Sequence, residues 1–348
     1  HMALDVDRFI CVWVVYTYDM NKGMDDYAYT AHYVSAEGEY LYSVSVSSPS
    51  DPDATSGQTA KELFDFHAYE PGETQVTMNM TDGSTKEVTV PTLKDPKTGK
   101  TYLADAERKI LCGDVADMFY KEKLTPVETV NVDPVDAHVY YNFIRVWDYY
   151  RNVGWEGPDG KGTPSLLLMN YVDEGGNPID NACYLTKTKG FQVFAWSRHM
   201  DFGGCLDIVG HEFTHCVTTN TMKYNIYKND TGAINEAYSD IMGSLIEIRL
   251  DGNSKSDYEG AWKIGENCGS PVRNMADPHE YAQPAFAFDT YYSPCVVVPT
   301  EANDKGGVHT NSSLLALCAV KLDEAGMTPR DQSYFWINSA LVISPQTD

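Results

Sequence analysis

Basic residues are scarce in this 348-residue chain: 26 lysines and arginines stand against 50 aspartates and glutamates, and the formal net charge is −24 at pH 7. This balance argues against nucleic acid and against an anionic membrane surface as partners, because both bind to basic faces. Long apolar runs are missing as well. The most apolar stretch, FICVWVVYTY at 9–18, is strand-like and too short to span a bilayer.

The eight cysteines include no C-x-x-C pair, which argues against a cysteine zinc site and against a redox motif. Eight cysteines allow disulfides, but the sequence leaves their connectivity open. Cys216 and Cys318 lie inside apolar helical patterns and are expected to be buried free thiols. No signal peptide is visible, and the opening His-Met resembles the scar of an expression tag, so the compartment also stays open.

The order of local patterns predicts an α+β chain. Runs rich in aromatic and β-branched residues come first and indicate strands. Apolar residues at helical spacing dominate later. We therefore expect a β-rich N-terminal lobe and a mainly α-helical C-terminal lobe. The strand-rich stretches are 9–46, 58–125 and 163–196, the helical patterns are 134–152, 206–222, 232–250 and 311–325, and residues 47–57 have linker composition.

The motif GHEFTHCV places His211 and His215 four residues apart, so on a helix both can face one metal ion. Catalytic zinc needs a third protein ligand and an open position for water. Glu236, in TGAINEAYSDIMGSLIE, offers that ligand, and Asp240 one turn later can accept a hydrogen bond from a ligand histidine. Each histidine alone is better explained as a satisfied core residue, whereas the combination predicts a zinc site.

Several motifs together resemble the thermolysin family of zinc endopeptidases. The resemblance rests on DIVGHEFTH, TGAINEAYSD and GGVHTNS, and it extends to VDPVDAHVYYNFIRVWDYY, NACY and AWKIGENCGSPVRNMADP. These motifs cover roughly residues 130–348. Zinc aminopeptidases also combine H-E-x-x-H with a later glutamate, but their G-A-M-E-N motif is missing from the sequence. An aminopeptidase is therefore a less favoured hypothesis.

The resemblance implies a zinc site in the cleft between the two lobes. His211, His215 and Glu236 would hold Zn²⁺, and Glu212 would be the general base that activates the attacking water. The implied reaction is hydrolysis of peptide bonds.

The resemblance also implies residues that stabilise the transition state and bind substrate. His309, oriented by Asp304, and Tyr227 would donate hydrogen bonds to the oxyanion. An apolar pocket would favour cleavage before a bulky hydrophobic residue, although ordinary core packing explains its three lining residues equally well. The implied substrate-binding residues are Arg273 for a carbonyl, Asn181 and Ala182 for edge-strand pairing, and Ile208, Ile264 and Val272 for the pocket.

A calcium site is implied by Asp207, Glu247 and Glu266, whose carboxylates are hard oxygen ligands. Two further acidic positions of the family's double-calcium pattern are Ala261 and Lys263 here. Because a lysine opposes a second cation, we expect one Ca²⁺ at most.

The sequence departs from the family pattern at both ends. Only 39 residues follow His309, so the C-terminal lobe looks incomplete and a complementary C-terminal fragment is an expected partner. Residues 1–50 resemble the end of an inhibitory propeptide, the alternative being extra strands of the N-terminal lobe. The expected domains are 1–50, a β-rich segment; 51–205, the N-terminal lobe; and 206–348, the truncated helical lobe.

The expected function is that of a secreted zinc metalloendopeptidase acting on protein or peptide substrates. Its alternative is a latent precursor, or a non-catalytic remnant that acts as a binding protein. Secretion is implied by the resemblance alone.

Overall fold

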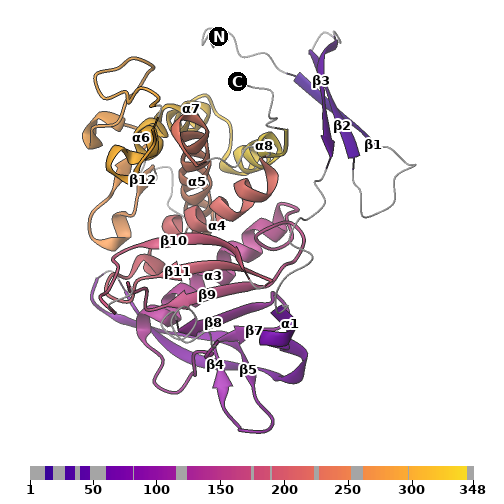
Figure 1. Ribbon diagram of the computed structural model, residues 1–348, viewed down its shortest axis with the longest axis vertical. Helices are drawn as coiled ribbons and strands as arrows, with labels where there is room; N and C mark the ends of the chain where they lie inside the picture. The colour runs from indigo at the N-terminus through magenta and orange to yellow at the C-terminus, as the bar shows by residue number, and fades with distance from the viewer. Residues whose placement is uncertain are drawn as a thin grey trace. The chain divides into compact units, whose positions relative to one another are not determined.

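The computed structural model divides the chain into two units, one made of His1–Ser56 with Asn338–Asp348 and one of Gly57–Ile337 (Figure 1). The first unit contains an antiparallel sheet of β1 (Val12–Tyr18), β2 (Ala28–Ser35) and β3 (Tyr40–Ser47), in the order β1-β2-β3. The described residues are 12–18, 28–35, 40–47, 60–80, 82–114, 124–173, 176–188, 190–222, 227–251, 262–296 and 298–342. Most of the linker expected at 47–57 lies outside them.

Most strands of the larger unit lie in its first part. Its strands are β4 (Glu70–Asn79), β5 (Thr85–Lys94), β6 (Thr101–Tyr102), β7 (Ala104–Asp105), β8 (Ile110–Asp114), β9 (Ser165–Met169), β10 (Ala182–Thr188), β11 (Phe191–Trp196), β12 (Lys263–Ile264) and β13 (Arg273–Asn274). A five-stranded sheet has the order β10-β11-β9-β8-β7. Two further sheets have the orders β4-β5-β6 and β12-β13. β9 pairs in parallel with β8 and β11, whereas the two edge strands, β10 and β7, pair antiparallel with their neighbours.

Most helices begin in the later part of this unit. They are α1 (Ala60–Leu63), α3 (Pro134–Asn152), α4 (Leu206–Thr221), α5 (Asn229–Leu250), α6 (Asp304–Asn311), α7 (Ser313–Glu324) and α8 (Pro329–Val342). Short 3₁₀ helices are η1 (Phe66–Ala68), η2 (Phe202–Gly204), η3 (Glu266–Cys268), η4 (Pro278–Tyr281) and η5 (Glu301–Asn303). The expected β-rich N-terminal and helical C-terminal regions are confirmed. Among the described residues, no helix combines the length and apolarity needed to cross a bilayer.

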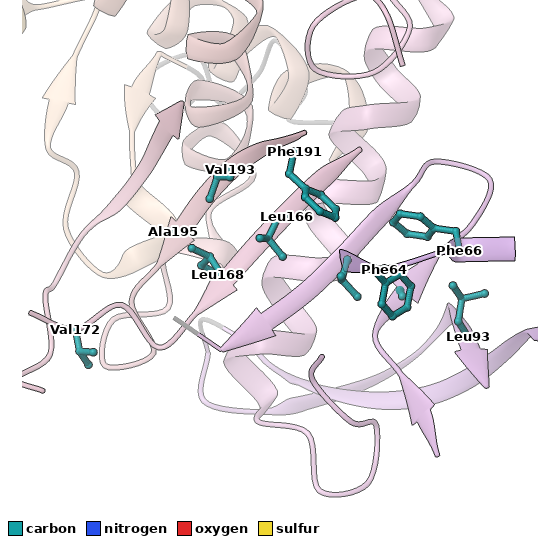
Figure 2. Packing of buried hydrophobic residues seen from close by; sticks show 11 residues of the cluster. Phe64, Phe66, Leu93, Leu166, Leu168, Val172, Phe191, Val193 and Ala195 are labelled. Atoms are coloured by element: carbon teal, nitrogen blue, oxygen red, sulfur yellow. The ribbon is translucent and has the colours of Figure 1, made fainter. Parts of the chain in front are cut away.

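Side-chain alternation gives the five-stranded sheet two buried faces. In the parallel register Leu166 lies beside Val193, and Leu168 beside Ala195, so these four residues share one face. Figure 2 shows this face covered by the aromatic side chains that precede β4 and by β5. The buried cluster consists of Phe64, Phe66, Leu93, Ala104, Leu111, Leu166, Leu168, Val172, Phe191, Val193 and Ala195.

The opposite face of the sheet packs against helices. Phe194, which alternates with Val193, lies 5.0 Å between ring centroids from Phe143 of α3. Phe143 in turn lies 5.4 Å from Phe213 of α4. These aromatic contacts attach α4, which carries the two motif histidines, to the buried side of the sheet.

Helices α4 and α5 approach closely because glycines face each other where they cross. A Cβ at Gly243 would lie 2.4 Å from the carbonyl oxygen of Asp207, and one at Gly210 would lie 3.0 Å from Gly243 Cα. No side chain fits in such a gap. The two glycines therefore set the distance at which side chains of α4 and α5 meet.

The structure also defines a disulfide that the sequence left open, Cys205–Cys268, with 6.0 Å between the Cα atoms. It joins the residue before α4 to the end of η3. Cys216 is a buried free thiol as expected, whereas Cys318 is free but only half-buried.

Candidate active site

Helices α4 and α5 bring His211, His215 and Glu236 together. The Nε2 atom of His211 lies 3.5 Å from Glu236 Oε2, and that of His215 lies 3.3 Å from Glu236 Oε1. One ligand atom from each residue lies within 4.8 Å of the other two. The imidazole rings meet edge to face with centroids 4.5 Å apart. The predicted zinc ligands thus converge from adjacent turns of two helices.

The second nitrogen of each histidine is held by a neighbour on α5. His211 Nδ1 donates to Asp240 Oδ1 at 2.9 Å, which is the contact that the sequence predicts. His215 Nδ1 donates to Asn235 Oδ1 at 2.7 Å. Both rings therefore present Nε2 toward Glu236, as metal-binding imidazoles fixed by an outer partner do.

The charges of this cluster fit a cation. Burial opposes ionisation of Glu236, yet His215 and His211 hold its pKa well below the usual range. Burial also opposes the charged form of His215, but the Glu236 carboxylate raises the His215 pKa to about 9. Glu236 Oε2 is buried without a hydrogen-bond partner. Two imidazole nitrogens and this free oxygen make a donor set suited to Zn²⁺.

Glu212 lies between the predicted zinc ligands and the edge strand β10 of the sheet. Its side chain is 7% exposed, and its Oε2 accepts a hydrogen bond from the backbone N–H of Tyr184 in β10 at 2.8 Å. Burial raises the pKa of Glu212. A carboxylate with a raised pKa, fixed beside a metal-ligand set, can take a proton from water and release it again near neutral pH.

Three polar residues from the later part of the chain lie on the His215 side of the cluster. Tyr227 donates a short hydrogen bond from its hydroxyl to Glu236 Oε1 and lies 3.2 Å from His309 Nε2. The Nδ1 of His309 lies 2.5 Å from Asp304 Oδ1. Asp304 also accepts the backbone N–H of His309 at 2.9 Å, which fixes the ring. The tyrosine hydroxyl and the imidazole therefore point toward the same region as Glu236.

The predicted substrate-binding residues border one cavity of about 680 Å³, which the predicted zinc ligands and Glu212 also line. Asn181 and Ala182 are at the start of β10, the open edge of the sheet. Ile208 and Ile264 are buried, and Val272 is 49% exposed. Ile208 lies in the first turn of α4, and Ile208 and Val272 both lie near Gly265, which follows Ile264, so these three apolar side chains gather beside the start of α4.

Arg273 also lines the cavity, and a carboxylate holds it in place. Its guanidinium donates to both oxygens of Asp240, at 2.8 and 2.6 Å. Burial opposes its charge, but Asp240 raises the Arg273 pKa above its already high value. Asp240 therefore links the orientation of His211 to that of Arg273.

Asp207, Glu247 and Glu266 form a second cluster on the same pair of helices and η3. Their carboxylate oxygens approach within 4.8 Å. Asp207 is satisfied by the backbone N–H groups of Ile208 and Gly265, at 2.7 and 2.5 Å. The Oε2 atoms of Glu247 and Glu266 are buried without partners. Oxygen atoms alone, two of them unsatisfied, suit a hard cation such as Ca²⁺.

The neighbourhood of this cluster limits how much positive charge it would take. Lys263 lies close enough to lower the pKa of Glu266, which burial raises. Its Nζ lies 3.8 Å from Glu280. Ala261, the other position where an acidic residue was expected, lies outside the described residues.

Two contacts of the site went unnoticed in the sequence. Asn235 directly precedes Glu236, and adjacent helix residues do not share a face, so the spacing that identified Asp240 did not indicate it. The contact between the Tyr184 N–H and Glu212 depends on how β10 packs against α4, and no local pattern in the sequence indicates it.

Comparison with known sequences agrees with this geometry. The family model described as "Thermolysin metallopeptidase, catalytic domain" matches residues 66–219, and the one described as "Thermolysin metallopeptidase, alpha-helical domain" matches residues 225–340. The chain therefore belongs to the thermolysin family of metallopeptidases. The match begins well before residue 130, where the motifs in the sequence placed its start.

Curated relatives carry names of the same kind. Bacillolysin of Bacillus caldolyticus and thermolysin of Alicyclobacillus acidocaldarius subsp. acidocaldarius are each 35% identical over 201 residues, which are 56% of this chain and 33% of the relative. A zinc metalloproteinase of Renibacterium salmoninarum is 40% identical over 194 residues, 51% of this chain and 34% of the relative. The matched region thus spans about a third of the length of these relatives.

Proposed function

We propose that this protein is a zinc-dependent endopeptidase that hydrolyses peptide bonds in protein or peptide substrates. The observation that carries the proposal is the convergence of His211, His215 and Glu236 beside the buried carboxylate of Glu212 in one cavity. When bound by these three ligands, zinc supplies Lewis acidity that makes water a better nucleophile and polarises a carbonyl.

The side chains around the cluster have complementary tasks in the proposed reaction. Glu212 takes a proton from the attacking water and passes it to the leaving amine. Tyr227 and His309 donate hydrogen bonds to the oxygen on which negative charge develops. Asp304 keeps the His309 ring aimed at that position, and Arg273 binds a substrate carbonyl.

The apolar lining of the cavity supports a preference for bulky apolar side chains. Ile208, Ile264 and Val272 would surround the side chain that follows the scissile bond. Asn181 and Ala182, at the open edge of the sheet, would pair with the substrate backbone and so bind it independently of its sequence. A peptide library cleaved without enrichment of large apolar residues after the cut would refute this specificity.

We also propose that the cluster of Asp207, Glu247 and Glu266 binds one calcium ion. Its support is the pair of buried, unpartnered oxygens on Glu247 and Glu266. The ion would hold η3 against the start of α4, where the Cys205–Cys268 disulfide also connects them.

Secretion is a further proposal, and the disulfide supports it independently of the family, because disulfides persist in oxidising compartments. The non-catalytic alternative is not favoured, since each side chain that the proposed reaction uses is present. A propeptide role for residues 1–50 and a complementary C-terminal fragment stay predictions.

The proposal is tested with a quenched fluorescent peptide that contains one internal Gly-Leu bond. We expect cleavage before leucine, loss of cleavage with a zinc chelator, and recovery when Zn²⁺ is returned. Mass spectrometry of the products distinguishes internal cleavage from stepwise release of N-terminal residues. Folded, zinc-loaded protein that leaves the peptide intact would refute the endopeptidase function, and release from the N-terminus alone would indicate an aminopeptidase.

A further inference from the structure

Lys305 places a positive charge at the wall of the active-site cavity, beside the residues proposed to stabilise the transition state. Its Nζ lies 4.8 Å from the ring centroid of Tyr227 and 3.1 Å from Oε1 of Glu301. The Lys305 side chain is 34% exposed, so a ligand in the cavity can reach it.

The backbone at Lys305 is unfavourable for a lysine. Its φ is 48°, and it lies in a run of four left-handed residues with Asp304 at 52°, Gly306 at 89° and Gly307 at 81°. Glycine or asparagine adopts this conformation more easily than a residue with a long side chain. Local backbone geometry therefore gives no reason for a lysine here, and its side chain is the feature that needs a role.

The order of residues along α4 shows on which side of the proposed zinc ligands Lys305 lies. Ile208 of the apolar pocket precedes His215 by seven residues, about 10 Å along a helix. Tyr227 packs against His215, with ring centroids 6.1 Å apart, and Lys305 lies over Tyr227. Lys305 and the apolar pocket therefore lie at opposite ends of the row of zinc ligands. If the pocket takes the residue after the scissile bond, Lys305 faces the residue before it.

The other charges of the cavity leave Lys305 available. Arg273, the other lysine or arginine among the described lining residues, is fixed by both oxygens of Asp240. The partner of Lys305, Glu301, has a side chain that is 86% exposed. An ion pair this exposed is weak and exchanges readily for another carboxylate.

We propose that Lys305 is a specificity-determining residue that binds the carboxylate of an acidic substrate side chain directly before the scissile bond. This inference rests on the proposed peptidase function. When no substrate is bound, Glu301 pairs with the Lys305 ammonium group, and it competes with the substrate carboxylate for this group.

The test compares two quenched fluorescent peptides that differ only in Glu or Gln directly before the cleaved bond, with leucine after it. For each protein variant we measure kcat/KM for both peptides and take the Glu-to-Gln ratio, because this ratio cancels any general change in rate. We expect the unsubstituted protein to favour Glu about fivefold, the size of a partly exposed ion pair. Raising the salt concentration should reduce this ratio.

Variants at and around Lys305 give the decisive outcomes. Lys305→Asn, which suits the left-handed backbone, should bring the ratio close to one, and Lys305→Glu should invert it. Glu301→Gln should raise it by removing the competing carboxylate. Lys321→Gln is the matched control, because Lys321 forms an exposed pair with Glu324 on α7 and does not line the cavity, and it should keep the ratio of the unsubstituted protein.

Other outcomes overturn the inference in distinguishable ways. A Glu-to-Gln ratio at or below one in the unsubstituted protein, or an unchanged ratio in Lys305→Asn, would show that Lys305 does not determine specificity. The proposed peptidase function would be unaffected. If the zinc-loaded protein cleaves neither peptide, the proposed function fails first.

Discussion

Two clusters of three candidate metal ligands lie on α4 and α5, the second completed by Glu266 of η3, and their charges are balanced in opposite ways. The histidine cluster combines two imidazoles with one carboxylate, whereas the carboxylate cluster combines three acids. The histidine cluster is His211, His215 and Glu236, and the carboxylate cluster is Asp207, Glu247 and Glu266.

The shifts in pKa show what this difference means. In the histidine cluster the imidazoles overcome burial and lower the pKa of Glu236. In the carboxylate cluster burial and like charges act together, and they raise the pKa of Asp207 to about 7 and that of Glu247 to about 10. The protein alone can therefore balance the first cluster, but the second needs protons or a cation. We assign chemistry to the first cluster and stability to the second.

The largest expected effect is a loss of activity when Glu212, beside the histidine cluster, is replaced. Glu212→Gln should lower kcat by at least about 100-fold, because the amide cannot accept the proton of the attacking water. Zinc content, measured by elemental analysis, and the melting temperature should stay close to those of the unsubstituted protein. A Glu212→Gln protein that keeps its turnover would remove Glu212 from the reaction.

The carboxylate cluster should show the complementary behaviour. A calcium chelator that spares zinc should lower the melting temperature, by the equivalent of about 2.7 kcal/mol of unfolding free energy where Ca²⁺ had been present at 100 times its Kd. Glu247→Gln should abolish this calcium dependence, while the surface control Glu324→Gln should retain it. Equal calcium dependence in the two variants would place the ion elsewhere.

Gly243 couples the two clusters, so replacing it should damage both. The added Cβ of Gly243→Ala would meet the Asp207 carbonyl and push α4 away from α5. We expect a loss of about 1–3 kcal/mol of unfolding free energy, with weaker binding of zinc and of calcium. Gly72→Ala is the control, because the nearest atom to its new Cβ would be 3.8 Å away. Calorimetry that finds both variants equally stable would contradict the close approach.

The smallest effect concerns pH. Asp207 and Glu247 have folded-state pKa values above their unfolded values near 4. Their contribution to the stability of calcium-free protein is therefore present below about pH 4 and is lost as pH rises, through about 7 for Asp207 and about 10 for Glu247. The gain in melting temperature from added Ca²⁺ should accordingly increase between about pH 5 and 8. A gain that is constant or shrinks over this range would argue against binding at these carboxylates.

Local sequence patterns predicted those elements whose ends are defined by neighbouring residues. Helix α3 spans the expected 134–152, because Asp133 caps it by accepting the N–H of Val135 at 2.9 Å and Pro134 suits the first turn. Helix α5 begins at Asn229, earlier than the expected 232. Asn229 bonds the backbone of Val296, a contact that local sequence cannot reveal.

The candidate site divides in the same way. Helical spacing and the need of zinc for a third ligand proposed His211, His215, Glu236 and Asp240, and the structure brings these four residues together. Spacing could not reach the residues that approach from distant segments. Tyr227, His309 and Asp304 were proposed through the family resemblance. The sequence shows that Lys305 is charged, but only the structure shows that this charge lies over Tyr227.

The most direct test of the account returns one metal at a time to metal-free protein and measures the rate of Gly-Leu peptide hydrolysis. The assignment of chemistry to the histidine cluster predicts that Zn²⁺ alone restores cleavage and that Ca²⁺ alone restores none. Cleavage with Ca²⁺ alone, or a folded protein that zinc leaves inactive, would contradict it.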